Sequence, residues 1–481
     1  NKTLLLQKFD PQKVIELIPV LRKIKNTFII LCGEHKAFVE TKKAVSASAY
    51  QYSRELAGQF QIVIRANATS TLSEIEKELK SVLVEWEKKG PTDDDIIKFK
   101  SQYQSNLYNQ LATVQGKGSS LASYFTLTKN ANFIKNDIQF YMGITKADVM
   151  RVYNLYIKNK FSVTLSCLPK GKGDLRAQPD NWKMYDRKIE TESNEYKNLS
   201  YIEPKDDFNR SIMPKPRQAI AVAVPDFYTT KINSIIPLIG IQEKEIPKVN
   251  ILITIKAGHR YESKEKSGLS QLLASMLGQS TLKTSAEEIE NKLDRLGSSV
   301  SINTSDEDLS ISIQTQKKNL NATLKIIKES MFEPKFDQTE FELEKKKQLD
   351  GISQSQTNAS ALADMAYKKL LYGQNNVMGY PSNGNAETVA SITLEDVKNH
   401  YALINSSMLS IAVSGDVTQD EITNELSFLS QLKQGSLISF DNTEITKIDK
   451  TKIYFVDKKN AAQSEIRIGY IALPFEALGD F

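Results

Sequence analysis

The apolar positions of the chain follow two periods, one typical of strands and one typical of helices. Alternating or continuous apolar runs predict strands at Phe60–Arg65, Val249–Ile255 and Leu309–Ile313. After Gly268 the apolar residues recur three and four positions apart, which predicts an amphipathic helix with one face toward a core. That face consists of Leu269, Leu272, Leu273, Met276 and Leu277. Together these elements predict a fold that contains both strands and helices.

Residues typical of the first turn of a helix predict where further helices begin. A capping box over Ser73–Glu76 predicts a long helix, and Thr92, followed by three aspartates, predicts the start of the next one. Thr145–Asp148 and either Thr284 or Ser285 predict two more starts. Other helices are expected over residues 119–127, 320–331, 340–354 and 359–371.

Part of the chain occurs twice. Residues 144–166 align without a gap on residues 392–414, so that a strand predicted at Phe161–Leu165 falls in register with Leu409–Val413. The strand at Phe60 aligns at nearly the same offset with Leu309–Thr315. A repeat of this length predicts duplicated two-layer domains rather than a solenoid, whose period would be about 20 to 50 residues.

Length and composition limit the number of domains and the kinds of partner. With 481 residues the chain is long enough for about three domains of ordinary size. Its 63 Lys and Arg against 58 Asp and Glu give a net charge of +5, spread along the chain, so no nucleic-acid partner is expected. No apolar run approaches the roughly 18 residues of a membrane helix, so no membrane span is expected.

Candidate catalytic and metal-binding residues are few. Cys32 and Cys167 are the two cysteines, too few for a disulfide framework or a Cys-rich metal site. His35, His259 and His400 stand far apart, and none has a second His four positions away. We therefore interpret each His as a surface or core residue rather than a metal ligand. Neither a Gly-x-Ser-x-Gly elbow nor a phosphate-binding loop is present.

The stretch Ala257–Thr281 nevertheless resembles the opening of the insulinase/pitrilysin (inverzincin) zinc peptidases. In that family a Gly-x-Arg-x-Glu strand end leads into a helix that carries His-x-x-Glu-His, and then into a Gly-Thr-like turn. Here Gly258, Arg260 and Glu262 match the strand end, and Gly278–Thr281 stand at the turn. The resemblance implies a clamshell of two halves that encloses an extended peptide. Each half would hold two α+β domains of two layers, with helices packed on one face of a mixed or antiparallel sheet.

The helix departs from the family pattern at the positions that bind zinc. In the motif two His at i and i+4 hold the metal, and the Glu between them is the general base. Those positions hold Gln271, Ala274 and Ser275 in this chain, and the family's third ligand, a distant Glu, falls on or near Gly351. The resemblance therefore predicts no catalytic residue, metal ligand or cofactor here, as in the second, non-catalytic half of these peptidases.

The resemblance and the repeat together predict the domain organisation. A polar linker rich in Lys, Gly and Pro separates two pairs of domains. The expected parts are the second domain of the first half (1–170), the linker (171–217), an inactive homologue of the zinc domain (218–404) and the beginning of a truncated fourth domain (405–481).

Both ends of the chain carry further expectations. The sequence predicts a strand at Thr3–Leu6 and a helix that begins at Asp10. The sequence that follows has no regular pattern, from which we predict that residues are missing near 20–35. A strand predicted at Glu465–Ala472 has no partner after it, and the family's transition-state Arg and Tyr would lie beyond Phe481. We therefore expect the natural protein to continue.

The resemblance implies a role in proteolysis, with a peptide or unfolded polypeptide as substrate. Zinc is expected in an upstream catalytic domain of the full-length protein, in cis, or in a catalytic partner subunit. The segment Asp206–Pro216 resembles the linker of the family's members in the bacterial envelope, which implies a periplasmic location. Two alternatives remain open: a catalytically inactive scaffold or partner subunit of the same fold, and an unrelated α/β repeat protein.

Overall fold

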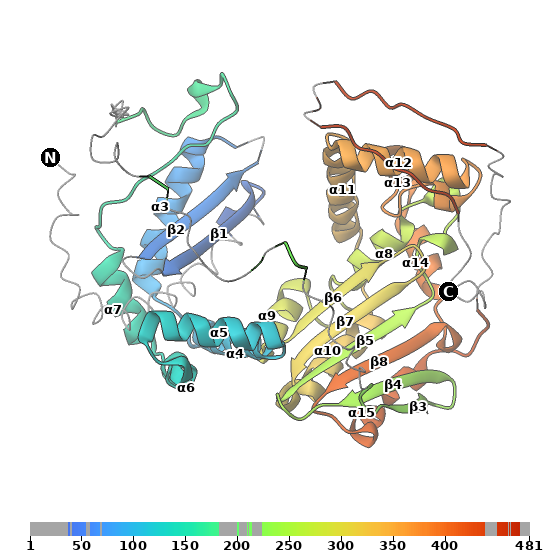
Figure 1. Ribbon diagram of the computed structural model, residues 1–481, viewed down its shortest axis with the longest axis horizontal. Helices are drawn as coiled ribbons and strands as arrows, with labels where there is room; N and C mark the ends of the chain where they lie inside the picture. The colour runs from blue at the N-terminus through green and yellow to red at the C-terminus, as the bar shows by residue number, and fades with distance from the viewer. Residues whose placement is uncertain are drawn as a thin grey trace. The chain divides into compact units, whose positions relative to one another are not determined.

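The computed structural model describes residues 37–38, 41–53, 58–67, 70–181, 200–201, 209, 211–213, 224–437, 450–459, 461 and 463–471. The chain divides into two compact units (Figure 1). The first includes Pro91–Arg151 and Asp226–Phe481, and the second includes Ile24–Gly90 and Val152–Pro225. Residues 91–151, which fall within the domain expected over 1–170, belong to the same unit as the large sheet.

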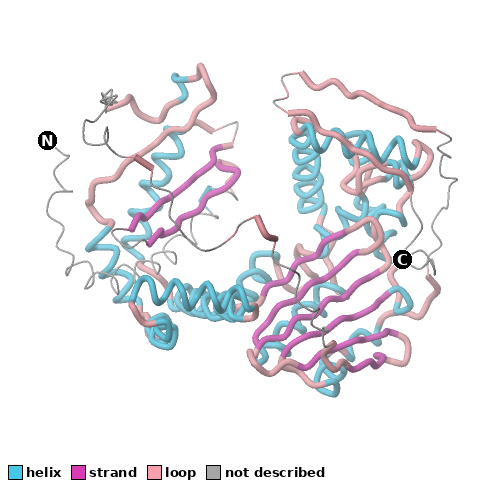
Figure 2. The backbone as a smooth tube through the Cα atoms, in the orientation of Figure 1, coloured by secondary structure: helices cyan, strands magenta, loops and turns pink. Residues whose placement is uncertain are grey.

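A six-stranded mixed sheet organises the first unit (Figure 2). The strand order is β3-β4-β8-β5-β7-β6, with β4 and β8 parallel and every other neighbouring pair antiparallel. The strands are β3 (Tyr228–Ile232), β4 (Ile236–Gln242), β5 (Lys248–Ile255), β6 (Ser299–Thr304), β7 (Leu309–Gln316) and β8 (Leu409–Gly415).

Strand β8, which follows the domain boundary expected at 404/405, is part of the large sheet. β8 lies between β4 and β5 in the interior of the sheet, where Ile411 pairs with both Leu238 and Ile253. Leu426 and Leu429, further along the chain, are fully buried in the same core. A strand inserted between two others cannot begin a separate domain, because removing it would expose both neighbouring edges.

Helices cover one face of this sheet. Burial alternates strictly along β8, with Leu409, Ile411 and Val413 inside and Ser410 and Ser414 exposed, so the opposite face is open. The helices of this domain are α8 (Leu269–Leu277), α9 (Ala286–Leu296), α10 (Leu320–Phe332), α11 (Gln338–Ser355), α12 (Ala359–Tyr372), α13 (Ala386–Ser391), α14 (Leu394–Ala402) and α15 (Gln419–Glu425). The predicted α+β class, with a mixed sheet and helices on one face, is confirmed.

Helix α4 (Asp93–Leu111) packs against the C-terminal end of α9 and the end of β7. Ser105 Oγ donates to Gly297 O at 2.6 Å and accepts from Gln316 Nε2 at 2.9 Å. Gly297 has a left-handed backbone with φ of 59°, and a Cβ there would lie 2.5 Å from Ser101 O. Glycine therefore both ends α9 and allows the close approach of α4.

Other described helices and 3-10 turns lie partly in the first unit and partly in the second. They are α5 (Val114–Thr128), α6 (Ile134–Met142), α7 (Lys146–Tyr156) and the short 3-10 turns η3 (Ala131–Phe133), η4 (Gly173–Leu175), η6 (His259–Tyr261), η7 (Lys264–Lys266), η8 (Lys317–Asn319), η9 (Val377–Gly379), η10 (Ser406–Met408) and η11 (Ser427–Gln431). None of the described helices has the length and apolar composition needed to cross a lipid bilayer.

The second unit contains a small antiparallel sheet and a long helix. β1 (Ala44–Ser53) pairs with β2 (Gly58–Ala66), and Ile75 of α3 (Leu72–Lys89) joins their core. The capping box of α3 consists of Thr71 and Glu74 rather than Ser73–Glu76. Thr71 is the N-cap residue of α3, and its hydroxyl accepts a hydrogen bond from the Glu74 N–H.

The repeat is visible in local structure. Thr145 donates its hydroxyl to Asp148 at the start of α7, and Thr393 makes the equivalent bond to Asp396 at the start of α14, both at 2.8 Å. The aligned pairs Ile144 and Ile392, and Val149 and Val397, are all buried. The strand that follows is formed only in the second copy.

Two predicted strands are not formed in the described residues. Residues 161–165 carry no strand, and Phe161 is 88% exposed. Residues 465–471 likewise carry none, and Ile468 is 93% exposed. An alternating pattern produces a strand only beside a hydrogen-bonding partner, and no described strand pairs with either segment. The elements expected at Thr3–Leu6, Asp10 and 19–35, together with His35, Cys32 and most of the linker, lie outside the described residues.

Candidate functional site

The matched strand end forms a tight connection between β5 and α8. Gly258 N–H donates to Glu307 O at 3.0 Å, and a Cβ on Gly258 would lie 2.4 Å from Asp308 N. Arg260 Nη1 pairs with the Glu307 carboxylate at 2.7 Å. The glycine therefore permits close backbone packing, and the arginine fixes the loop between β6 and β7 beside this connection.

Glu262 binds the start of α8. Its Oε2 accepts Gly268 N–H at 2.9 Å, and its Oε1 accepts Ser270 N–H at 2.6 Å, with the side chain fully buried. Gly268, at the N-cap position, has no side chain to accept these N–H groups. A carboxylate is favoured here because the N-terminus of a helix carries partial positive charge.

His259 joins this carboxylate to a distant loop. Its Nδ1 lies 2.9 Å from Glu262 Oε2, and its Nε2 lies 2.9 Å from Val377 O and 3.1 Å from Tyr380 O. All these partners are acceptors, so both ring nitrogens must donate, which requires a protonated imidazolium. Burial lowers the pKa of His259, but the hydrogen bond and charge of Glu262 outweigh it, and the net pKa is raised.

His400 extends the same buried network from α14. Its Nε2 lies 3.1 Å from Ser270 Oγ and 3.4 Å from Ala257 O. Burial lowers the pKa of His400, which favours the neutral ring. Sequence reasoning missed that His259 and His400 lie in one network, because they stand 141 positions apart. The one available signal was Gly268, an N-cap without a side chain beside a nearby Glu.

The aligned zinc positions on α8 make ordinary packing and polar contacts. Gln271 Oε1 accepts a hydrogen bond from Thr304 Oγ1 of β6 at 3.0 Å. Ala274 is buried in the core below the sheet, and Ser275 is half-buried. An amide and a hydroxyl stand where the two zinc-binding imidazoles would be, and a methyl group stands where the carboxylate of the general base would be.

Gly351 lies on α11, which packs against α8. Gln348 Nε2, one turn earlier, donates to Gly268 O at 3.1 Å. Gly351 is exposed, and a Cβ there would meet no atom within 4 Å. Within the described part of the chain, no group of three or more His, Cys, Asp and Glu side chains is placed to hold a metal ion.

The strand β6 supplies a free sheet edge beside α8. Among the described strands it pairs with β7 alone, so its other edge presents backbone N–H and C=O groups. Its inward side chains include Thr304, which is bonded to Gln271. Its outward side chains, Ser299, Ser301 and Asn303, are exposed and uncharged. An extended peptide could add to this edge through main-chain hydrogen bonds.

Comparisons with known proteins agree with this geometry. Residues 239–379 match the family model described as Insulinase (Peptidase family M16). A non-peptidase homolog, YmxG of Helicobacter pylori, is 26% identical over 203 residues, covering 41% of this chain and 47% of that protein. An uncharacterized zinc protease, YmxG of Bacillus subtilis, is 26% identical over 230 residues, covering 47% of this chain and 55% of that protein.

One solved structure is also similar in part. A peptidase M16 inactive domain from Pseudomonas fluorescens matches with a TM-score of 0.43 at 19% identity, covering 45% of this chain and 53% of that chain. The chain spans about half the length of the curated relatives it matches.

The fold is of the α+β class, and helix α8 carries Gln271, Ala274 and Ser275 at the positions that align with the family's zinc motif. Residues 239–379 match the model of the insulinase family, peptidase family M16. The resemblance inferred from Ala257–Thr281 is thereby confirmed.

Proposed function

We propose that this chain is the non-catalytic portion of an insulinase-like zinc metallopeptidase, which encloses peptides and helps to cleave them. The observation that carries this proposal is the contrast within one element. Helix α8 follows the matched Gly-x-Arg-x-Glu strand end and has its N-terminus bound by Glu262, but it carries Gln271, Ala274 and Ser275 at the positions of the zinc motif. Zinc and the catalytic base would come from an upstream domain of the full-length protein, which we place in the periplasm.

The chain would contribute one wall of the peptide chamber. The open face of the sheet presents small polar side chains, among them Ser301, Ser312 and Ser414, which can contact a peptide without selecting strongly for charge. The β6 edge adds sequence-independent main-chain hydrogen bonds. Such a surface would hold an extended substrate, and the specificity would come from other parts of the protein.

Amide hydrogen exchange tests this role on the chain itself. An unstructured peptide of about 15 residues, added at saturating concentration, should slow exchange at β6, because each new inter-strand hydrogen bond protects an amide. The other sheet edge, β3, is the internal control and should not change. Unchanged exchange at β6 in the presence of bound peptide would overturn the proposal.

A second candidate is a catalytically inactive scaffold or partner subunit of the same fold. The relative from Helicobacter pylori, which is named a non-peptidase homolog, favours this candidate. Zinc content and chelator-sensitive peptide cleavage of the full-length protein distinguish the two. Zinc together with cleavage supports the peptidase, whereas neither supports the scaffold.

A further inference from the structure

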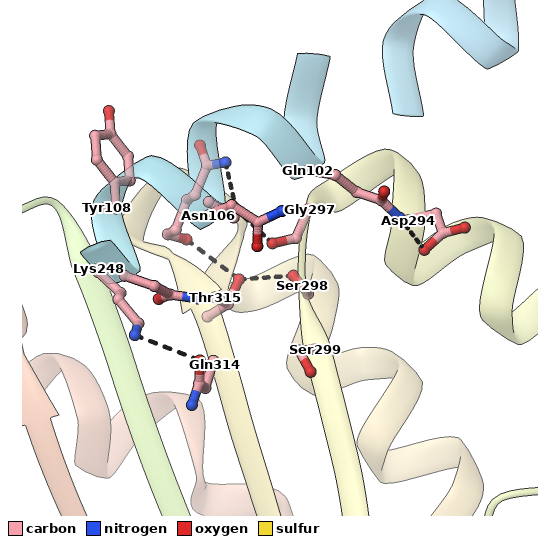
Figure 3. A pocket seen from close by; sticks show the side chains of 13 residues that line it. Gln102, Asn106, Tyr108, Lys248, Asp294, Gly297, Ser298, Ser299, Gln314 and Thr315 are labelled. Carbon is pink, nitrogen blue, oxygen red and sulfur yellow. Dashed lines mark hydrogen bonds between the residues drawn. The ribbon is translucent and has the colours of Figure 1, made fainter. Parts of the chain in front are cut away.

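A polar cavity lies where α4 crosses the end of the sheet (Figure 3). Its volume is about 300 Å³, and it is lined by α4, the last turn of α9 and the ends of β5, β6 and β7. All these elements belong to the first compact unit. The volume lies at the lower end of the range for small-molecule sites, so the cavity suits a small ligand.

Amide and hydroxyl groups make up most of the lining. Gln102 and Asn106 line it from α4, while Gln314 and Thr315 line it from β7 (Figure 3). Ser105 of α4 is also part of the lining. Each amide offers both donors and acceptors. A lining of this kind matches a ligand that alternates N–H and C=O groups, as a peptide main chain does.

One cation and one anion stand among these neutral groups. Lys248 Nζ donates to Gln314 Oε1 at 3.4 Å, and Asp294 Oδ1 accepts from Gln102 Nε2 at 2.7 Å. Neither forms an ion pair with any residue that the structure describes. Burial lowers the pKa of Lys248, and burial raises the pKa of Asp294, so each charge lacks full compensation.

We propose that this cavity binds a short peptide with free termini, with its carboxylate at Lys248 and its amino group at Asp294. Each terminus would supply the opposite charge that the protein group lacks, and the amides would bond the main chain between them. This inference takes from the proposed function only that peptides are the ligands. The cavity reaches Ser299 at the start of β6, but its two charged residues, Lys248 and Asp294, lie outside that strand.

The width of the cavity sets the length of the peptide. Lys248 begins β5, and Asp294 lies in the helix turn that leads into β6, with β7 between the two strands. Two strand spacings of about 4.8 Å separate β5 from β6, or roughly 10 Å. An extended peptide spans about 3.3 to 3.6 Å per residue, so about three residues reach across.

Calorimetric titration of the chain with trialanine tests the inference. Trialanine should bind, and N-acetylated trialanine, C-amidated trialanine and free alanine should each bind at least about tenfold more weakly, because each loses a charge-assisted contact or cannot span the site. Lys248→Gln and Asp294→Asn should weaken trialanine binding to a similar degree. The matched controls Lys244→Gln and Glu290→Gln, which change exposed residues outside the cavity, should leave it unchanged.

Pairing each variant with one blocked peptide makes the test specific. The Lys248→Gln variant should bind C-amidated trialanine as well as it binds free trialanine, because the contact with the carboxylate is already absent. For the same reason, the Asp294→Asn variant should bind N-acetylated and free trialanine equally well. Equal binding of blocked and free trialanine, or equally tight binding of alanine, would overturn the inference. Protection of the β6 amides by the longer peptide is a separate measurement. A negative result in that experiment would not change the conclusion about this cavity.

Discussion

His259 Nδ1 and Glu262 Oε2 lie 2.9 Å apart, and both side chains are completely enclosed. This pair connects three elements: η6 holds the histidine, α8 begins on the carboxylate, and the loop at η9 supplies the carbonyls on the other side of the ring. In the family pattern a Gly-x-Arg-x-Glu strand end leads into the zinc helix. In this chain the Glu keeps that helix in place although the helix carries no zinc ligand.

The protonation of His259 should make stability depend on pH. Burial lowers the pKa of His259, but the hydrogen bond and charge of Glu262 outweigh this effect, with a smaller contribution from Asp306. The folded pKa is therefore raised above the ordinary value of 6.5. The stabilisation should therefore be complete below about pH 6.5 and lost as the pH rises through the folded pKa. Urea unfolding of wild type and His259→Gln from pH 6 to pH 9 should show a difference of about 3 kcal/mol at the acid end that shrinks upward. A difference that grows with pH would contradict this assignment.

Glu262→Gln should destabilise the domain by about 3 kcal/mol, because an amide cannot neutralise the buried imidazolium or accept both α8 N–H groups through charged oxygens. The matched control is Glu307→Gln, which removes an exposed partner of Arg260 and should cost less than about 1 kcal/mol. Chemical unfolding at pH 6 measures both. Equal losses for the two variants would show that the buried pair has no special role.

The two glycines discussed above should respond oppositely to alanine. Gly351 lies inside α11 with open space around its Cβ position, so Gly351→Ala should stabilise the domain by about 0.5 to 1 kcal/mol. Gly297 has a left-handed backbone and α4 at close range, so Gly297→Ala should destabilise it by about 1 to 3 kcal/mol. Thermal unfolding checks the two signs, and loss of stability in Gly351→Ala would mean that α11 is packed differently at this position.

Restoring ligands should create a zinc site if the alignment with the family motif is correct. The triple variant Gln271→His, Ser275→His and Gly351→Glu supplies two imidazoles at i and i+4 and a carboxylate from α11. It should bind stoichiometric zinc at least tenfold more tightly than a matched variant with Gly351→Gln. Equal affinity in the two would show that Gly351 does not correspond to the third ligand.

The sequence predicted most elements whose signals are local. The strict alternation of Leu309–Ile313 and the apolar face of α8 predicted their structure, since both depend on neighbours within a few positions. The place of β8 could not be predicted, because the same alternating pattern suits a strand in either of two adjacent domains. The strand expected at Phe161–Leu165 failed for a related reason: its pattern matches that of β8, but no described strand pairs with it.

The candidate site divides in the same way. The positions Gln271, Ala274, Ser275 and Gly351 follow from fixed spacings, so the sequence could identify them. The network of His259, Glu262, Ser270 and His400 depends on η6 and α14 meeting at the start of α8, and no spacing encodes that contact. The cavity at Lys248 and Asp294 likewise exists only because α4 crosses the end of the sheet.

Zinc content is the most direct measurement of the central claim, that this chain has the peptidase fold without its metal site. The purified chain would be dialysed against micromolar zinc, washed, and analysed by elemental mass spectrometry, with the triple histidine-glutamate variant measured beside it. We predict far less than stoichiometric zinc in the native chain. Tight, stoichiometric zinc in the native chain would contradict the account, because it would mean that residues other than the aligned positions form a metal site.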